Sequence, residues 1–323
     1  MKKILVAALC LLSVSLLYAQ DAFNPVDPVR MGPAGKAKFD TYVIGDGSQS
    51  YTANRWITPF DMNRYETTYA LWYLVRVDAE KRGYVFMNPG QEGSEGKRGA
   101  APTKKGLHHP VTMISWYDAV VWCNAFSEYC GYKPCYTYKG VVVKDSTETA
   151  QLDLADCDWD ANGWRLPTES EWEYAARRTV SGYQSGGLCS GQVDKNGRND
   201  ISIPEDEVAW TANNANGTHI VGTAGTPFKD DAPPAPGGGN PNGAGLFDMS
   251  GNILEFCWDW YGTYIESQPG KRATGAEAGS QRVSRGGSWS IYNPFAYTGD
   301  RYNYDPNECY NYMGLRVCRT VVQ

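Results

Sequence analysis

Residues 245–262 constrain the fold more than any other stretch, because they set a single glutamate, Glu255, among aromatic side chains. The aromatic members are Phe247, Phe256, Trp258, Trp260 and Tyr261. A carboxylate buried among such side chains costs free energy unless a partner compensates its charge. Asp248 and the Gly251-Asn252 turn could direct oxygens toward Glu255, and such oxygens are the ligands that calcium takes. The residues alone therefore leave two interpretations: a cation site at Glu255, or a carboxylate that caps a turn or pairs with an arginine.

The first residues have the pattern of a secretory signal. Two lysines precede an apolar run from Ile4 to Leu17, and Ala19 follows at the expected cleavage point. A basic start, a short apolar region and a small residue are typical of export signals, and the run is too short to span a membrane comfortably. We therefore expect residues 1–19 to be removed and the protein to be exported, to the periplasm, the cell surface or the medium.

The remaining chain is expected to form one domain. Residues 20–37 contain several prolines and predict a leader with little structure, and residues 38–321 predict the domain itself. No segment after the signal is apolar enough to predict a membrane span.

The charge balance excludes nucleic acid as an expected partner. The chain has 30 basic and 36 acidic residues, for a formal net charge of −6 at pH 7, and it contains no basic block of the kind that binds phosphates. Nine cysteines are present, one of them, Cys10, within the signal. The others permit disulfides in an exported protein, but their pairing stays open, and a residue such as Cys123 is also consistent with a buried thiol.

Capping residues predict three helices. Thr68 and Ser115 each precede an apolar stripe at helical spacing, with Asp118 in the first turn of the second helix. Thr168 and Glu171 form a capping-box pattern, and the helix that it starts is expected to fray near Arg178. The side chains expected to face the core include Trp72, Cys123, Trp172 and Ala176.

Short alternating runs predict strands at residues 38–44, 57–65, 282–289 and 314–318. Segments rich in glycine, proline or acidic residues predict exposed loops at residues 90–106, 153–162, 181–200 and 232–245. A few helices, short strands and long ordered loops together predict an α+β fold.

The histidines do not predict a catalytic metal. The chain has only His108, His109 and His219. Because neighbouring side chains in an extended segment point to opposite sides, His108 and His109 are poorly placed for an iron site of two histidines and a carboxylate. No nucleophile elbow, phosphate loop or dinucleotide fingerprint is present, and no cysteine has a histidine partner nearby in the sequence.

Residues 288–313 have the composition of a binding surface. Tyrosine supplies rigid contact area, and the interspersed asparagine, serine and aspartate supply adaptable hydrogen bonds, as in antibody loops. Ordinary packing in a loop-rich domain is the alternative. The tyrosines expected to contact a ligand are Tyr292, Tyr297, Tyr302, Tyr304, Tyr310 and Tyr312.

Six ordered motifs resemble those of the formylglycine-generating enzyme, or sulfatase-modifying factor, family. The motifs are Tyr65 to Thr68, His109 to Ala119, Arg165 to Arg177, Gly245 to Tyr261, Arg285 to Trp289, and Gly314 to Arg316. The resemblance implies the family's fold, which is a variant of the C-type lectin fold with little regular secondary structure. It also implies that Trp289 and Arg316 belong to the framework.

The resemblance does not carry the family's oxidase chemistry with it. The two cysteines that bind copper in oxidase members correspond by position to Ile291 and Ala296, and neither can act as a thiolate, so no copper is expected. Cys309 and Cys318 lie too far along the chain to replace them. A second branch, the sulfoxide synthases, takes iron through a His-rich helical domain that this sequence lacks.

A third branch comprises lectin-fold display proteins that diversify the segment between the Gly-Gly-Ser-Trp and Gly-Phe-Arg motifs, which corresponds here to Ser290 to Met313. The family's calcium site implies that the Glu255 side chain joins the carbonyl oxygens of Ser250, Gly251 and Ile253. We therefore expect an exported, non-oxidase member of the family that binds a protein or glycan outside the inner membrane through its C-terminal tyrosines. The alternative is an enzyme of the family that acts on protein cysteine or sulfur substrates.

Overall fold

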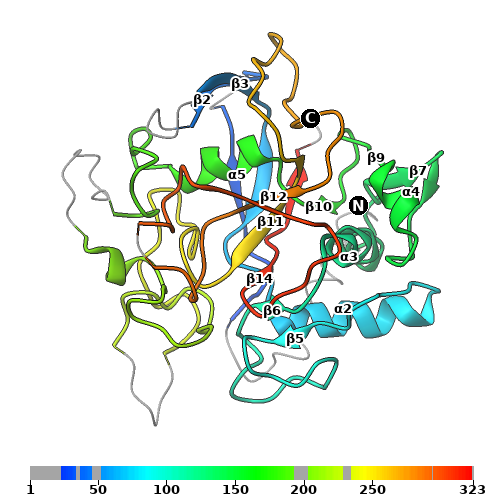
Figure 1. Cartoon of the computed structure of the whole chain (residues 1–323), viewed down its shortest axis with the longest axis horizontal. Coiled ribbons are helices and arrows are strands. Elements are labelled where there is room, and N and C mark those ends of the chain that lie inside the picture. The colour runs from blue at the N-terminus through cyan, green and yellow to red at the C-terminus, as the bar shows by residue number, and fades with distance from the viewer. Residues whose placement is uncertain are drawn as a thin grey trace, which may run out of the picture.

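The computed structural model describes residues 23–33, 37–45, 52–192, 203–227, 234–292 and 294–321. The expected signal at residues 1–19, with Cys10, lies outside these ranges. Figure 1 shows short helices beside small central sheets, joined by long loops. The helices are α2 (Tyr69–Lys81), α3 (Trp116–Tyr129), α4 (Thr149–Asp153) and α5 (Glu169–Ala176), with a 3-10 turn, η1 (Glu205–Glu207).

Two four-stranded sheets form the centre of the molecule. The first has the order β1-β4-β15-β10, built from β1 (Pro28–Met31), β4 (Phe60–Asn63), β15 (Cys318–Thr320) and β10 (Trp164–Arg165). The second has the order β13-β12-β11-β14, built from β13 (Arg301–Tyr304), β12 (Arg282–Arg285), β11 (Leu254–Trp260) and β14 (Met313–Gly314). Only the β11–β14 pair of these two sheets is parallel. The glutamate-bearing stretch thus forms an inner strand.

Three smaller sheets lie at the periphery of these two. They pair β2 (Asp40–Ile44) with β3 (Ala53–Ile57), β5 (Gln91–Glu92) with β6 (Val111–Thr112), and β7 (Tyr136–Tyr138) with both β8 (Val141–Val142) and β9 (Asp156–Cys157). The fold is therefore α+β with little regular secondary structure, as the sequence predicts.

The predicted helix starts are confirmed. The Thr68 side chain accepts a hydrogen bond from the Leu71 backbone at the start of α2. Ser115 with Asp118, and Thr168 with Glu171, form complete capping boxes at α3 and α5. Each box satisfies backbone N–H groups that would otherwise lack partners in the first turn.

Two hydrophobic clusters hold the layers together. In the first, α2 packs on α3, and the indole of Trp72 stacks on that of Trp122 with ring centres 5.4 Å apart. In the second, α5 packs beneath β11 and β12, with Trp172 fully buried. Cys123 and Ala176 are also buried, as predicted. The structure shows no disulfide at seven of the described cysteines: Cys123, Cys135, Cys157, Cys189, Cys257, Cys309 and Cys318.

The predicted leader is wrong for part of its length. Pro28 to Met31 form β1, which pairs with β4 at the edge of the first sheet. An edge strand needs only one side of its backbone to be paired, so proline at its first position costs no ladder hydrogen bond. Val26 also packs into the first cluster, so the folded domain begins before residue 38.

Several strand and loop boundaries also differ from the prediction. Residues 57–65 break at Thr58-Pro59, and residues 314–318 divide between β14 and β15 in different sheets. The segment 90–106 is not simply exposed, because Gln91 is buried and forms β5. Within the described residues, no helix is long and apolar enough to cross a membrane.

Candidate functional site

Glu255 forms a buried ion pair with Arg316. The guanidinium Nη2 lies 2.7 Å from Oε1, and Nε lies 3.1 Å from Oε2. The indole N–H of Trp172 also donates to Oε2, over 2.7 Å. The structure therefore shows the arginine partner that the sequence left as one of two interpretations.

Two further carboxylates surround this pair. Glu66 accepts hydrogen bonds from the side chain of Asn252 and the backbone of Ile253, and burial raises its pKa well above the usual value. Burial likewise raises the pKa of Asp248 to about 6. Arg316 thus compensates the negative charge of Glu255. Its complete burial confirms its place in the framework.

The contacts of Glu255 bear on the calcium site that the family resemblance implies at this turn. The expected ligands are the Glu255 side chain and the carbonyls of Ser250, Gly251 and Ile253, and all four residues are buried at the turn. Both carboxylate oxygens of Glu255 already accept hydrogen bonds from Arg316. In this arrangement Glu255 does not fit a metal ligand, because a cation there would have to displace or repel the guanidinium. Within the described residues, no group of three or more His, Cys, Asp or Glu side chains is arranged to hold a metal.

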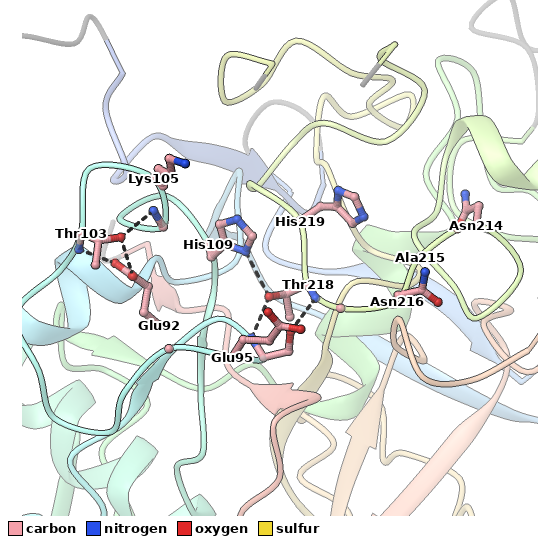
Figure 2. Close-up of a pocket in the computed structure, with 14 residues that line it drawn as sticks. Glu92, Glu95, Thr103, Lys105, His109, Asn214, Ala215, Asn216, Thr218 and His219 are labelled. Atoms are coloured by element: carbon pink, nitrogen blue, oxygen red, sulfur yellow. Dashed lines mark hydrogen bonds between the residues drawn. The ribbon is translucent and has the colours of Figure 1, made fainter. Parts of the chain in front are cut away.

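A polar pocket of about 580 Å³ lies where the loop from β5 to β6 meets residues 214–219 (Figure 2). We call it the histidine pocket, because His109 and His219 both line it. Its other polar side chains are Glu92, Ser94, Glu95, Thr103, Lys105, Asn214, Asn216 and Thr218.

Reciprocal hydrogen bonds join the two halves of the histidine pocket. The Ser94 backbone N–H donates to Thr218 Oγ1 over 2.9 Å, and the Thr218 backbone donates to Ser94 Oγ over 3.1 Å. His109 Nδ1 lies 3.1 Å from Thr218 Oγ1. Residue 93 must be glycine, because its φ is +55° and a Cβ there would lie 2.4 Å from Thr218 Oγ1.

Both histidines of the pocket are neutral at physiological pH. Burial lowers the pKa of His109 to about 4, with smaller contributions from the other two histidines. Burial alone lowers the pKa of His219 to about 4, and its ring stacks on Trp210 with centres 3.8 Å apart. Neutral imidazoles can donate and accept hydrogen bonds, so the pocket suits a polar ligand better than an anion held by charge.

The Gly251-Asn252 turn positions one wall of this pocket. Asn252 adopts a left-handed conformation, with φ of +58°. Its side-chain oxygen accepts from the His219 backbone over 2.9 Å, and its amide donates to Glu66. The signature turn therefore positions residue 219 at the pocket wall. The participation of Ser94, Thr218 and His219 could not be predicted from local sequence, because their contacts join distant segments.

His108 and His109 point to different pockets, as predicted. His108 lines a second cavity of about 580 Å³ with Phe23 and Tyr65. The Phe23 ring packs edge-on against His108 with centres 4.9 Å apart. The two histidines therefore do not share a metal site.

The structure brings four of the six predicted tyrosines together. Tyr302 and Tyr304 lie on one face of the edge strand β13, and Tyr310 stacks on Tyr312 with ring centres 5.0 Å apart and planes 5° apart. Tyr304 meets Tyr310 edge-on at 5.8 Å. All four are half-buried against the first cluster.

Two exposed aromatics lie in the loop next to this surface, and one predicted tyrosine lies apart. Tyr292 and Phe295 are 64% and 57% exposed, and the Tyr302 hydroxyl donates to the Phe295 carbonyl. Tyr297 instead packs beside Ala296 and donates to Glu205 over 3.1 Å. We define the tyrosine face as Tyr292, Phe295, Tyr302, Tyr304, Tyr310 and Tyr312.

The tyrosine face borders the histidine pocket. Asn311 donates through its side chain to the Ser94 carbonyl over 3.2 Å. Its own carbonyl accepts from the Trp289 indole over 3.2 Å. Trp289 thus acts as framework between the two surfaces, and a ligand that covered the tyrosines would reach the pocket edge.

The positions of the oxidase cysteines have no thiolate chemistry here. Ala296 is fully buried, and its carbonyl accepts hydrogen bonds from Ser250 Oγ and, at 3.6 Å, from Cys189 Sγ. Burial raises the pKa of Cys189 far above the usual value. Ile291 is half-buried against the first cluster. Copper bound by two thiolates therefore does not fit the residues at this place.

Comparisons with known proteins agree on one family. A family model described as "Sulfatase-modifying factor enzyme 1-like domain" matches residues 19–321. The chain is 34% identical over 230 residues to "Chaperone protein LppX" of Paenibacillus barcinonensis, covering 67% of this chain and 71% of that protein. It is also 34% identical over 294 residues to the formylglycine-generating enzyme of Streptomyces coelicolor, covering 86% and 74%.

Solved structures share the fold. Treponema denticola variable protein 1 superposes with a TM-score of 0.67 at 24% identity, over 91% of this chain and 95% of that one. CarF superposes with a TM-score of 0.62 at 26% identity, over 92% and 99%. The predicted fold, an α+β variant of the C-type lectin fold as in formylglycine-generating enzymes, is confirmed.

Proposed function

Since the chain belongs to the sulfatase-modifying factor enzyme 1-like family, we propose that it is an exported binding protein of that family. It holds a partner protein on the tyrosine face and performs no thiol oxidation. The observation that carries this proposal is the cluster of half-buried tyrosines beside the histidine pocket, together with two exposed aromatics, Tyr292 and Phe295, in the adjoining loop.

Physical reasoning supports a binding role for these aromatics. Exposed aromatic side chains that gather on one surface usually mark an interaction site. Tyrosine and tryptophan anchors carry most of the energy of protein interfaces. Tyr310 and Tyr312 are already stacked, so they would lose little conformational entropy when a partner binds.

A protein partner is favoured over a glycan by one relative. The similar protein from Paenibacillus barcinonensis is named a chaperone protein, and a chaperone binds polypeptide. The neutral imidazoles and the side-chain amide of Asn216 in the adjoining pocket suit hydrogen bonds to a peptide backbone.

The alternative function is oxidation of a protein cysteine. The 34% identity to the Streptomyces coelicolor enzyme over 86% of this chain favours it. Ile291 and Ala296 oppose it, because they stand where the resemblance places the two copper-binding cysteines. An oxidase without those thiolates would need a different metal site.

A paired binding assay tests the proposal. The Tyr310→Ala/Tyr312→Ala double variant is compared with Tyr138→Ala, which truncates a half-buried tyrosine on β7. Binding is measured to arrays of purified cell-surface proteins and of glycans, and unfolding by urea is measured in parallel. We expect the double variant to lose a protein partner that the control retains, while both stay folded.

Three results would contradict the proposal. Partner binding that survives in the double variant would remove the tyrosine face from the function. Binding to glycans alone would replace the protein partner. Conversion of a cysteine-containing sulfatase peptide by the copper-supplemented parent protein would establish the oxidase instead.

A further inference from the structure

A third pocket lies beside α4 and β9, on surfaces that the proposed function does not use. Its volume is about 380 Å³, which is within the range of small-molecule sites. We call it the arginine pocket. Its charged and aromatic lining includes Asp153, Asp156, Trp159, Trp260, Glu277 and Arg282.

Arg282 is a buried cation held between two indoles. It is 2% exposed. Its guanidinium carbon lies 3.7 Å from the ring centre of Trp116 and 3.3 Å from that of Trp260. Nη1 donates to the Trp258 carbonyl over 2.8 Å. The position of the guanidinium is therefore fixed by stacking and by one backbone hydrogen bond.

The charge of Arg282 lacks a close counter-ion. None of the ion pairs among the described residues involves it, and Nε has no hydrogen-bond partner within the described part of the chain. Burial lowers its pKa to about 9, so the side chain stays charged at neutral pH. A buried charge without a partner is unfavourable, and a carboxylate delivered by a ligand would relieve this cost.

The mouth of the arginine pocket has the opposite charge. Asp153, Asp156 and Glu277 line it and are exposed, so three carboxylates face one guanidinium. The Tyr117 hydroxyl donates to Asp153 Oδ1 over 2.8 Å, which fixes that carboxylate at the mouth. An anion alone would be repelled there, whereas a ligand that also carries ammonium groups would be attracted.

We propose that the arginine pocket binds a small basic zwitterion of the class of L-lysine. Its carboxylate meets the Arg282 guanidinium in a charge-assisted hydrogen bond. Its ammonium groups meet Asp153, Asp156 and Glu277. Its aliphatic chain lies against the indoles of Trp159 and Trp260, which line the pocket.

Titration calorimetry on the full mature chain tests this site with matched ligands. The probes are L-lysine, 6-aminohexanoate, which lacks the α-ammonium group, and cadaverine, which lacks the carboxylate. We expect L-lysine to bind most tightly and cadaverine at least about tenfold more weakly, since it leaves Arg282 without a counter-ion. Affinity should fall as salt is added, because the mouth charges are exposed.

Matched protein variants separate the site from general charge. Asp156→Asn and Glu277→Gln each remove an exposed carboxylate from the mouth, and each should weaken L-lysine binding by about fivefold. Asp160→Asn removes an exposed carboxylate four residues beyond Asp156 but outside the pocket, and it should have no effect. These substitutions avoid the buried Arg282, whose replacement endangers folding.

Three results would overturn the site. The first is that L-lysine gives no binding heat at concentrations up to about 10 mM. The second is that cadaverine binds as tightly as L-lysine, which would show that Arg282 does not bind the ligand carboxylate. The third is that Asp160→Asn weakens L-lysine binding as much as Asp156→Asn does, which would show a non-specific effect of charge.

Discussion

Arg316 forms a buried ion pair with the carboxylate of Glu255: Nη2 lies 2.7 Å from Oε1, and Nε lies 3.1 Å from Oε2. The pair joins inner strand β11 to the segment between β14 and β15. Trp172 adds a hydrogen bond from α5 to the same carboxylate. The Glu255 carboxylate therefore links three distant parts of the chain: β11, α5 and the segment between β14 and β15.

Glu255→Gln should destabilise the protein by about 3–5 kcal/mol, because it leaves a buried guanidinium without its partner. The control is Glu80→Gln, which breaks the pair with Arg76 at a site where Glu80 is 43% exposed, and it should cost less than about 1 kcal/mol. Urea unfolding measures both. Equal urea midpoints for the two variants would show that the buried pair stabilises the protein no more than the exposed pair does.

Removal of calcium tests the prediction made from the family's metal site. Because Arg316 already compensates Glu255, we expect the melting temperature of the purified protein to be the same in EGTA and in added calcium. An ion bound only to the native state would stabilise it by linkage. A melting temperature that falls in EGTA and recovers with calcium would establish the site and require Arg316 to move.

Helix α5 should tolerate the loss of its cap better than the loss of its core tryptophan. Thr168→Ala removes the side chain that accepts from the Glu171 backbone and should cost about 1 kcal/mol. Trp172→Ala should cost about 3–5 kcal/mol, as for other large core aromatics. Unfolding of Trp172→Ala at the same urea concentration as the parent would place the side chain at the surface and refute the packing described.

Asp259 makes stability fall as pH rises. Burial, followed by repulsion from Glu169, raises its pKa to about 7, whereas an unfolded aspartate has a pKa of about 3.9. A raised carboxyl pKa means that the folded state holds its proton longer, so its stabilising contribution is present below pH 4 and is lost between about pH 4 and pH 7. The loss is at most about 4 kcal/mol.

Asp259→Asn tests this dependence, because asparagine keeps an oxygen to accept from the Glu169 backbone and does not titrate. We expect the stability of the variant, relative to the parent, to rise between pH 4 and pH 7. The comparison is made by urea unfolding at each pH. A constant difference between the two proteins over that interval would show that Asp259 is ionised throughout.

Local features of the fold could be predicted from sequence because their causes are local. The caps at Thr68, Ser115 and Thr168 depend on residues within one helical turn. The strand β1 was missed because its pairing with β4 is not visible in a proline-containing segment.

The site was predicted less well because distant contacts build it. Glu255 and Arg316 are 61 residues apart, and Ser94 and Thr218 are 124 residues apart. Composition indicated a tyrosine-rich surface, but only the register of β13 and the stacking of Tyr310 on Tyr312 show which tyrosines share a face. Tyr297 lies in the same tyrosine-rich segment of the sequence, but it packs against a different hydrophobic cluster, beside Ala296.

Site-specific photo-crosslinking in the native cells tests most directly whether the tyrosine face holds a partner protein. Benzoylphenylalanine replaces Tyr310 on the tyrosine face in one strain and Tyr138 on β7 in another, and the products are identified by mass spectrometry. We expect one discrete partner protein to be crosslinked through position 310 and to be absent from the products of position 138. The same products from both positions, or none from position 310 in folded, exported protein, would contradict it.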